Sequence, residues 1–166
     1  MMRWILWSVA LLALLAVLVV VIGWRLPKGH TASRSARVAM PPDAVYQVLA
    51  DVDRYQTWRP GVKTLTRLPD HDGRPAWIEE SGGMKIPLYF ERMERPALLV
   101  TRIADPALPF GGTWTYRIAP APGGCELTIT EDGEVTNPIF RFMSRFVFGY
   151  YKTLDEFVAN LQAKAR

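Results

Sequence analysis

The chain of 166 residues is long enough for one domain and a short additional segment. Its formal net charge is +4, but four basic residues, Arg3, Arg25, Lys28 and Arg34, lie before residue 37, and no acidic residue precedes Asp43. The remaining 16 of the 20 basic residues are matched by 16 acidic residues. Because nucleic-acid-binding domains concentrate basic residues on their folded part, this distribution excludes nucleic acid as the expected partner.

The chain begins with an apolar stretch, and residues 4–24 contain no charged side chain. About 20 apolar residues are enough for a helix to cross the hydrocarbon core of a bilayer. Trp4, Trp7 and Trp24 lie near the ends of this stretch, where indole rings favour the membrane interface. A cleaved signal peptide is the alternative, but its apolar core has only about 7–15 residues. We therefore predict an uncleaved transmembrane anchor over residues 1–24.

The basic residues on the two sides of this anchor predict its orientation. Arg25, Lys28, Arg34 and Arg37 follow the apolar stretch, whereas Arg3 precedes it. Because loops rich in lysine and arginine stay on the cytoplasmic side, we expect the domain to face the cytoplasm. The sequence thus predicts a single-pass protein of a bacterial inner membrane.

A short polar segment separates the anchor from the rest of the chain. GHTASRS is small and polar, as flexible spacers are, and we predict a juxtamembrane linker over residues 25–36. The weak alternation in RSARVAM indicates a first strand, with which a ligand-binding domain over residues 37–166 begins. PPD then favours the start of a helix, and DRYQTW indicates a second short helical turn before a Pro-Gly pair.

Beyond residue 61 the hydrophobic period changes to two, which is typical of strands. Six segments show it: VKTLTRL, PAWIEES, KIPLYFERME, LLVTRIA, TWTYRIA and CELTITEDGEV. The connections between them are short, so we expect antiparallel hairpins. From Asn137 to the end, apolar residues recur every three or four positions, which predicts one continuous helix. This order of elements predicts an α+β domain.

The cysteine and histidine content bears on metals and cofactors. The chain has one cysteine, Cys125, and two histidines, His30 and His71, both in stretches that resemble loops. These residues give no plausible set of zinc ligands. A single cysteine also excludes an intrachain disulfide. We predict no metal and no cofactor, and the oligomeric state stays open.

Three stretches resemble the START-like superfamily, also called helix-grip or SRPBCC, and in particular its polyketide cyclase/dehydrase branch. They are MPPDAVYQVLADVDRYQTWRPGV, PFGGTWTYRI and NPIFRFM, and the resemblance extends from Arg37 to the C-terminus. It implies a curved sheet of antiparallel strands, here seven, around a long C-terminal helix, with a ligand cavity between them. Members of this superfamily bind lipids, sterols, polyketides and similar apolar molecules, and some catalyse cyclisation or dehydration. The resemblance carries over no catalytic residue.

Glu131 is the first candidate for chemistry. It continues the alternation of Cys125, Leu127 and Ile129, so its carboxyl is expected to point toward the C-terminal helix. Desolvation there would favour the protonated form, and the group could serve as a general acid or base. Alternatively, the strand frays or bulges near its end and leaves Glu131 in water. Tyr116 would add a hydroxyl that orients a polar group of a ligand.

Aromatic side chains are the candidates for the wall of the cavity. They lie on the predicted strands, in the corner after the short helices, in the loop DPALPFGG and on the closing helix. Ordinary core packing explains the same residues, since large aromatic side chains dominate protein cores. The predicted ligand-binding residues are Trp58, Trp77, Phe90, Phe110, Trp114, Tyr116, Glu131, Phe146 and Tyr150.

The start of the closing helix carries further aromatic side chains outside its main apolar stripe. They are Phe142, Phe148 and Tyr151, with Arg141 and Arg145 between them. A basic and aromatic surface of this kind could rest on lipid headgroups. Contact with the curling edges of the sheet explains the same side chains without a membrane, and both interpretations stay open.

Three functions are compatible with these features. The first is a membrane-tethered module that holds a lipid or another hydrophobic small molecule between the sheet and the C-terminal helix. The second is an enzyme of the polyketide cyclase or dehydratase type that uses Glu131 and Tyr116. The third is an interaction module whose groove receives an apolar segment of a partner. The anchor favours the first, because apolar molecules partition into the adjacent bilayer, and we expect binding in preference to catalysis.

Overall fold

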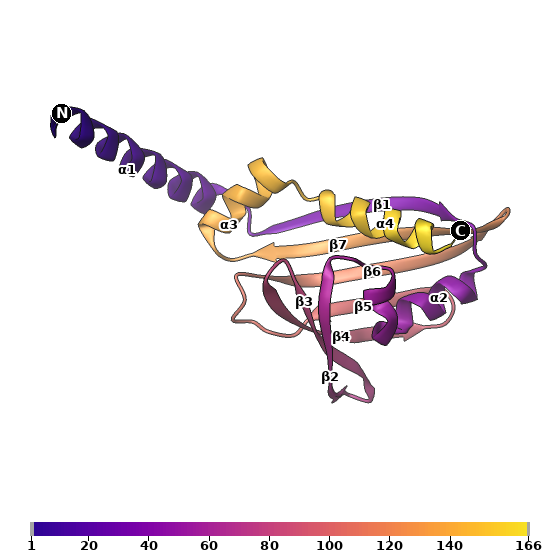
Figure 1. Cartoon of the computed structure of the whole chain (residues 1–166). Coiled ribbons are helices and arrows are strands. Elements are labelled where there is room, and N and C mark those ends of the chain that lie inside the picture. Colours follow the sequence, from indigo (N-terminus) through magenta and orange to yellow (C-terminus); the bar gives the residue numbers. More distant parts are fainter. Residues whose placement is uncertain (1, 166) are drawn as a thin grey trace.

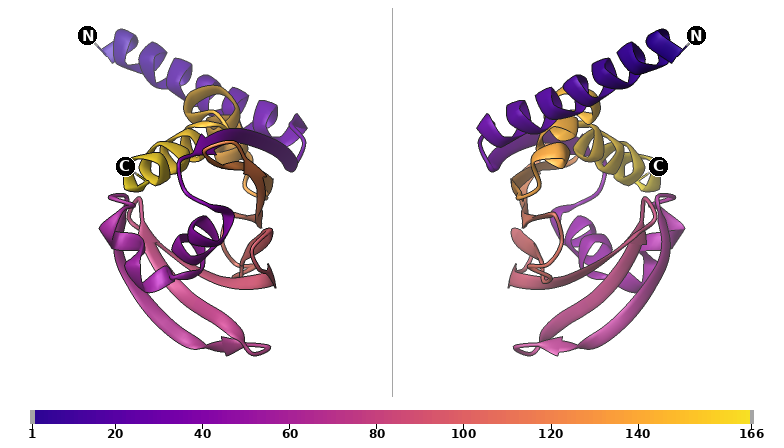
Figure 2. Two further views of the ribbon diagram at one scale, coloured as in Figure 1. Left: turned by 90° about the vertical axis from the view of Figure 1, so that its right-hand side faces the viewer. Right: turned by 90° about the vertical axis from the view of Figure 1, so that its left-hand side faces the viewer.

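The computed structural model describes residues 2–165 of the chain. Its domain is built on one sheet of seven strands in the spatial order β1-β7-β6-β5-β4-β3-β2, with every neighbouring pair antiparallel. The strands are β1 (Gly29–Val38), β2 (Val62–His71), β3 (Arg74–Ser81), β4 (Met84–Glu94), β5 (Leu98–Ile103), β6 (Phe110–Ala121) and β7 (Gly124–Val135). The sheet curves strongly (Figures 1 and 2), which confirms the predicted α+β helix-grip fold.

Alternating side chains of β6 and β7 build one face of the core. Tyr116 and Ile118 on β6 and Leu127 and Ile129 on β7 are buried, as the period of two predicts. This face packs against the C-terminal helix α4 (Lys152–Lys164). The buried residues of α4 are Leu154, Phe157 and Leu161.

Two short helices follow β1 and form a corner before β2. They are α2 (Pro42–Ala50) and the 3₁₀-helix η1 (Val52–Thr57). The buried Tyr55 hydroxyl donates to the carbonyl oxygen of Leu49 at 2.5 Å. The Tyr55 ring also meets Trp58 edge to face, with ring centroids 5.6 Å apart. These two aromatic residues therefore fix the corner from the inside.

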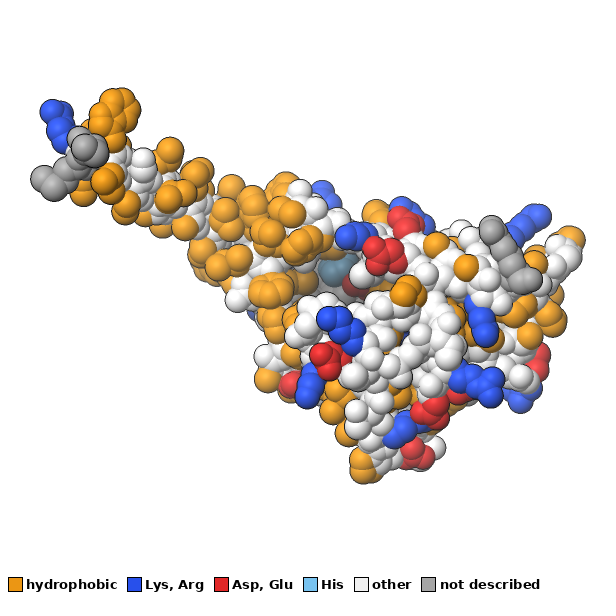
Figure 3. Space-filling model, viewed as in Figure 1, with side chains coloured by type: hydrophobic (Ala, Val, Ile, Leu, Met, Phe, Trp, Pro, Cys, Tyr) orange, Lys and Arg blue, Asp and Glu red, His pale blue; other side chains and the backbone are white. Residues whose placement is uncertain are grey.

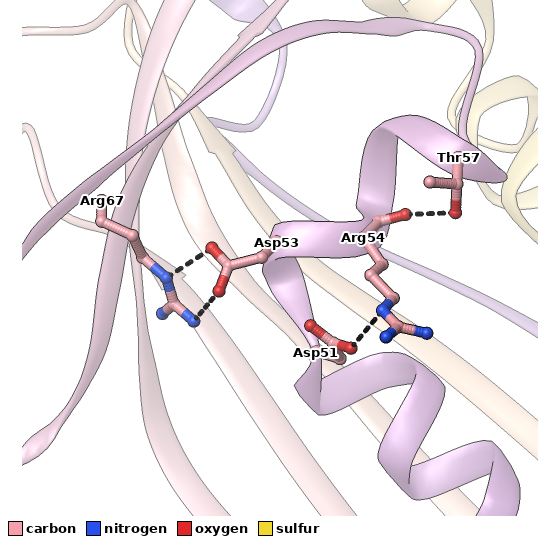
Figure 4. Close-up of polar contacts among 5 residues, drawn as sticks. All are labelled: Asp51, Asp53, Arg54, Thr57 and Arg67. Carbon is pink, nitrogen blue, oxygen red and sulfur yellow. Dashed lines mark hydrogen bonds and ion pairs between the residues drawn. The ribbon is translucent and has the colours of Figure 1, made fainter.

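Polar contacts hold the outer side of this corner (Figure 4). Arg67 on β2 donates to both carboxylate oxygens of Asp53, at 2.7 and 2.9 Å. Arg54 pairs with Asp51 at 3.3 Å, and the Thr57 hydroxyl donates to the carbonyl oxygen of Arg54 at 2.7 Å. Because the charged side chains are largely exposed, they contribute little to stability and mainly orient η1 against the sheet.

The C-terminal helix is broken, which corrects the prediction of one continuous helix. α3 (Pro138–Met143) continues into one turn of π-helix, η2 (Ser144–Phe148), and α4 begins only at Lys152. Gly149 has a φ of 73°, in the left-handed region that favours glycine, and this conformation ends η2. The apolar spacing did not reveal the break because apolar residues continue at helical spacing on both sides of it.

The segment predicted as a linker over residues 25–36 is mostly a strand. β1 begins at Gly29 opposite Glu134 and pairs with β7 along its whole length. Its small polar residues bond across the edge of the sheet: the Thr31 hydroxyl donates to Asp132 at 2.8 Å, and the hydroxyls of Ser35 and Thr128 lie 2.7 Å apart. The composition that suggested a flexible spacer is therefore the solvent-facing side of an edge strand.

Helix α1 (Met2–Arg25) projects away from the domain (Figure 1). By length and composition it can cross a membrane, and a signal sequence near an N-terminus meets the same criteria. Its side chains are almost all exposed, but Gly23 is buried against α3. A Cβ at Gly23 would overlap the backbone of Pro138, so this close contact requires glycine.

Candidate functional site

A pocket of about 400 Å³ lies at the end of the sheet next to α1. Strands β1, β6 and β7 form one side of it, and α3, η2 and the start of α4 form the other. The aromatic residues of its lining are Phe110, Trp114, Phe140, Phe148 and Tyr150. In Figure 3, apolar side chains over α1 and α3 continue to a hollow at this end of the domain.

Two glycines allow close packing at the wall of the pocket. Gly133 on β7 pairs with Gly112 on β6 and with His30 on β1, so this row across three strands carries only the histidine side chain. A Cβ at Gly133 would overlap the His30 imidazole, and one at Gly112 would overlap the backbone of Asp132. Gly112 also has a φ of 125°, which side chains disfavour. The packing of this wall therefore requires glycine at both positions.

His30 is held from three directions. Its Nε2 lies 3.3 Å from Oε1 of Glu131. Its ring stacks on Tyr150, with centroids 4.0 Å apart and an interplanar angle of 15°. Gly133 leaves room for the imidazole next to the strand. Tyr150 directly follows Gly149, whose positive φ turns the chain there, so the helix break and the histidine form one structural unit.

Glu131 provides the polar centre of the pocket. Its side chain is 20% exposed, and burial raises the pKa of its carboxyl, although the nearby His30 and Trp114 lower that pKa in part. Its second oxygen, Oε2, is buried and has no hydrogen-bond partner within residues 2–165. Such a carboxyl, placed beside an imidazole, can bond to a ligand or exchange a proton with it.

The pocket brings together four of the residues predicted to bind a ligand. They are Phe110, Trp114, Glu131 and Tyr150. Glu131 faces the C-terminal helices as its alternation indicates, because it contacts His30, whose ring packs on Tyr150. The alternative of a frayed strand end does not apply, since β7 stays paired up to Val135.

The other five predicted residues lie elsewhere in the described part of the chain. Trp58, Trp77, Phe90 and Tyr116 are buried in the core, and Phe146 is 59% exposed on η2. Trp77 and Phe90, for example, pack against each other with ring centroids 5.0 Å apart. Core packing, the alternative considered for the aromatic residues, accounts for the four buried ones.

A buried ion pair fills the centre of the domain. Arg59 donates to both carboxylate oxygens of Glu79 at 2.7 and 2.9 Å, and its guanidinium lies 4.8 Å from the centre of the Tyr55 ring. Tyr116 and Phe157 pack beside it, and burial raises the pKa of the Tyr116 hydroxyl. Tyr116 therefore belongs to this core cluster and does not share the pocket with Glu131.

His30 is the site residue that sequence reasoning missed, because GHTASRS was interpreted as a loop. The inward positions of β1 run from His30 through Ala32 to Val38, and this alternation was the available signal. It was concealed because the inward positions themselves include the polar residues His30 and Arg34 and two small alanines. Within residues 2–165, no group of three or more His, Cys, Asp or Glu side chains is arranged to hold a metal ion.

One protein family matches the chain over residues 29–166, and it is described as polyketide cyclase / dehydrase and lipid transport. The match begins at the first residue of β1 and covers the whole domain. The chain therefore belongs to this family, and α1 precedes the matched region. No curated protein matches the chain significantly.

Several solved structures share the fold at low sequence identity. A START superfamily protein from Mycobacterium smegmatis is 19% identical, with a TM-score of 0.63 over 82% of this chain and 97% of that one. The aromatase/cyclase Zhui from Streptomyces sp. R1128 is 16% identical, with a TM-score of 0.65 over 82% and 93%. Norcoclaurine synthase from Thalictrum flavum, in complex with dopamine and hydroxybenzaldehyde, is 12% identical, with a TM-score of 0.63 over 82% and 86%. These similarities establish the fold alone.

Proposed function

We propose that the chain is a membrane-tethered module that binds a lipid or another hydrophobic small molecule in the pocket beside η2. The observation that carries this proposal is a cavity of about 400 Å³ with aromatic residues in its lining and with the interacting side chains of His30 and Glu131 at its wall. Small-molecule sites are typically apolar cavities of about 300–1,000 Å³ with a few convergent polar groups. The family description and the ligand-bound norcoclaurine synthase support a small-molecule partner.

The lining favours a particular kind of ligand. Apolar parts of the molecule would pack against Phe110 and Trp114. The unpartnered Oε2 of Glu131 would bond to a polar group at one end of the molecule. Glu134 and Glu156 add negative charge to the lining, which Lys152 balances in part. A ligand whose polar end is a hydroxyl or an amine therefore fits this pocket better than an anion.

The contact between α1 and the domain supports an uncleaved anchor. Gly23 fits closely against the backbone of Pro138. The Arg141 guanidinium, which is buried, donates to the carbonyl oxygens of Leu26 and Thr136 at 2.9 and 2.8 Å. A signal peptide that is removed after export needs no fitted contact with the mature domain. The excess of basic residues after α1 supports a cytoplasmic domain.

The proposal is tested with the full chain, purified in detergent and released from the micelle for native mass spectrometry. The wild-type chain should retain a bound apolar molecule at one copy per chain. Ser144→Trp places an indole in the pocket lining and should reduce this occupancy at least tenfold. Thr66→Trp, on the exposed side of β2, is the matched control and should retain it. Equal occupancy in the two variants, or an empty wild-type chain, would contradict the proposal.

A second candidate is an enzyme of the cyclase or dehydratase type in which Glu131 exchanges a proton with a bound substrate. The observation that favours it is a partly buried carboxyl of raised pKa next to an imidazole, at the wall of an open pocket. Glu131→Gln should then abolish turnover of a polyketide-like substrate while native mass spectrometry still detects the bound molecule. Unchanged turnover would remove this candidate. The volume of the pocket suits either function better than it suits an apolar segment of a partner protein.

A further inference from the structure

Helix α3 and the residues after it expose an apolar, mostly aromatic surface. We call this surface the aromatic face, and it consists of Ile139, Phe140, Phe146, Val147, Phe148 and Tyr151. These side chains are 39–59% exposed, so contact with the edges of the sheet does not account for them. Clustered exposed apolar side chains mark a surface that contacts a membrane or another protein.

The aromatic face is rigidly connected to the end of α1. The Arg141 guanidinium bonds to Leu26, just after α1, and to Thr136, just before α3. Arg141 is only 5% exposed, so these bonds are shielded from water. Pro138 rests directly on Gly23. In both views of Figure 2, α3 lies beside the C-terminal end of α1.

These contacts of Arg141 and Pro138, which we call the joint between α1 and α3, fix the depth of the aromatic face in the bilayer if α1 crosses a membrane. Trp24 is exposed and Arg25 is the last residue of α1. Tryptophan and arginine favour the interface between the hydrocarbon core and water. Because Pro138 contacts the preceding residue, Gly23, α3 begins at the depth of that interface.

The composition of the segment fits the same location. Residues 139–151 contain two charged residues, Arg141 and Arg145, and neither is acidic. Because Arg141 is buried against the end of α1, the basic side chain available to lipid headgroups is Arg145, which is exposed and adjoins Phe146. Aromatic side chains with interspersed basic residues suit the headgroup region of a bilayer that contains anionic lipids. The charge and the continuity with α1 thus favour a bilayer over a protein partner.

We propose that the aromatic face inserts into the surface of the bilayer that α1 spans and holds the mouth of the pocket against that membrane. Phe140 and Phe148 belong both to the aromatic face and to the lining of the pocket. A hydrophobic molecule can therefore pass between bilayer and pocket along these side chains without crossing bulk water. This inference rests on the proposed function in one respect, namely that α1 is a membrane anchor.

The test uses the full chain in nanodiscs of phosphatidylcholine and phosphatidylglycerol, with Cys125→Ala to remove the native thiol. A nitroxide is attached to one new cysteine, at Leu14, Val147 or Glu126, and its accessibility to oxygen and to a water-soluble nickel complex is measured. Leu14 reports on α1, and Val147 on the aromatic face outside the pocket lining. Glu126 is an exposed control, eight residues before Glu134 in β7 and so roughly 26 Å away along the strand.

We expect the ratio of oxygen to nickel accessibility at Val147 to exceed that at Glu126 at least fivefold and to stay below that at Leu14. Equal ratios at Val147 and Glu126, with Leu14 in the hydrocarbon core, would overturn the inference and leave the anchor intact. A Val147 label shielded from both reagents would mean that a second copy or a partner protein covers the face, which also overturns it. A water-exposed Leu14 label would refute the anchor and this inference together.

Discussion

Gly133 determines how β1, β7 and the C-terminal helices meet. The space of its missing side chain is taken by the His30 imidazole, which then stacks on Tyr150. Gly112, its partner on β6, lies so close to the backbone of Asp132 that a Cβ would not fit there. At the scale of single residues, the candidate site therefore depends on two glycines as much as on His30 and Glu131.

Gly133→Ala should destabilise the chain by about 1–3 kcal/mol, because overpacking a filled site costs about that much and the new Cβ would overlap the His30 ring. Gly29→Ala is the matched control in the same strand pair, since the nearest atom to its new Cβ is 3.9 Å away. Thermal unfolding followed by intrinsic fluorescence should show a midpoint several degrees lower for Gly133→Ala and little change for Gly29→Ala. Equal midpoints would show that Gly133 is not needed to accommodate His30.

The raised pKa of Glu131 predicts a pH dependence of stability. Burial raises the pKa of this carboxyl above its value in the unfolded chain. Between those two pKa values the folded state binds more protons, so the stability that Glu131 contributes is present at low pH and lost as the pH rises through the folded pKa. The Glu131→Gln variant has no carboxyl at this position, so it does not undergo this loss of stability as the pH rises.

The difference in unfolding midpoint between Glu131→Gln and the wild-type chain should therefore grow in favour of the variant from about pH 4 toward pH 7. Thermal unfolding at a series of pH values measures this difference. Glu126→Gln, on the exposed side of β7, is the control. A difference between Glu131→Gln and wild type that stays flat, or that shrinks with pH, would contradict the raised pKa.

At the scale of elements, the break between η2 and α4 is what forms the candidate site between the C-terminal helical region and the sheet. It places Tyr150 over His30 and leaves the pocket open between η2 and the sheet. The apolar spacing predicted where this helical region begins and which face it buries. It did not predict the break, because apolar residues continue at helical spacing on both sides of Gly149, whose positive φ ends η2.

Gly149→Ala should destabilise the chain by about 1–3 kcal/mol, because a φ of 73° with a ψ of 159° is a backbone conformation adopted essentially by glycine alone. It should also displace Tyr150 and reduce the occupancy of the pocket in native mass spectrometry. Gly61→Ala is the control, since a Cβ there meets only the Ser81 hydroxyl, at 3.9 Å. Full occupancy in Gly149→Ala would show that the break is not required for binding.

Elements whose signal lies in neighbouring residues could be predicted from the sequence, whereas features that depend on contacts between distant residues could not. Strands β2 to β7 and the helices α2 and η1 were predictable because their periodicity and turn residues are local. β1 was partly missed because its serines and threonines find partners on β7, at the other end of the domain sequence. Glu131 was found from the alternation of β7, whereas His30 depends on that same distant pairing.

Arg141→Gln should loosen the joint between α1 and α3, because it replaces a guanidinium that bonds to two backbone carbonyls. A nitroxide at Val147 should become more accessible to the nickel complex, while a label at Leu14 keeps its depth. Arg117→Gln, at an exposed position on β6, is the control and should leave both labels unchanged. Identical behaviour of the two variants would argue against Arg141 as the residue that positions the aromatic face.

At the scale of the whole molecule, α1, the aromatic face and the pocket lie together at one end of the sheet (Figures 1 and 3). The ion pair of Arg59 and Glu79 and the surrounding aromatic residues fill the centre of the domain. Arg3, Arg25 and Lys28, in or beside α1, account for three of the four net positive charges, and the domain from Gly29 onward is close to neutral. The fold common to the family is thus combined here with a segment that can hold the pocket beside a bilayer.

The most direct test of this account is photolabelling of the full chain in nanodiscs with a long-chain alcohol that carries a diazirine on its alkyl chain. Peptide mass spectrometry then locates the adducts. We predict adducts at Phe110, Trp114 and Phe148 that are lost in Ser144→Trp and retained in Thr66→Trp. Adducts confined to α1, with none in the pocket of the wild-type chain, would contradict the account.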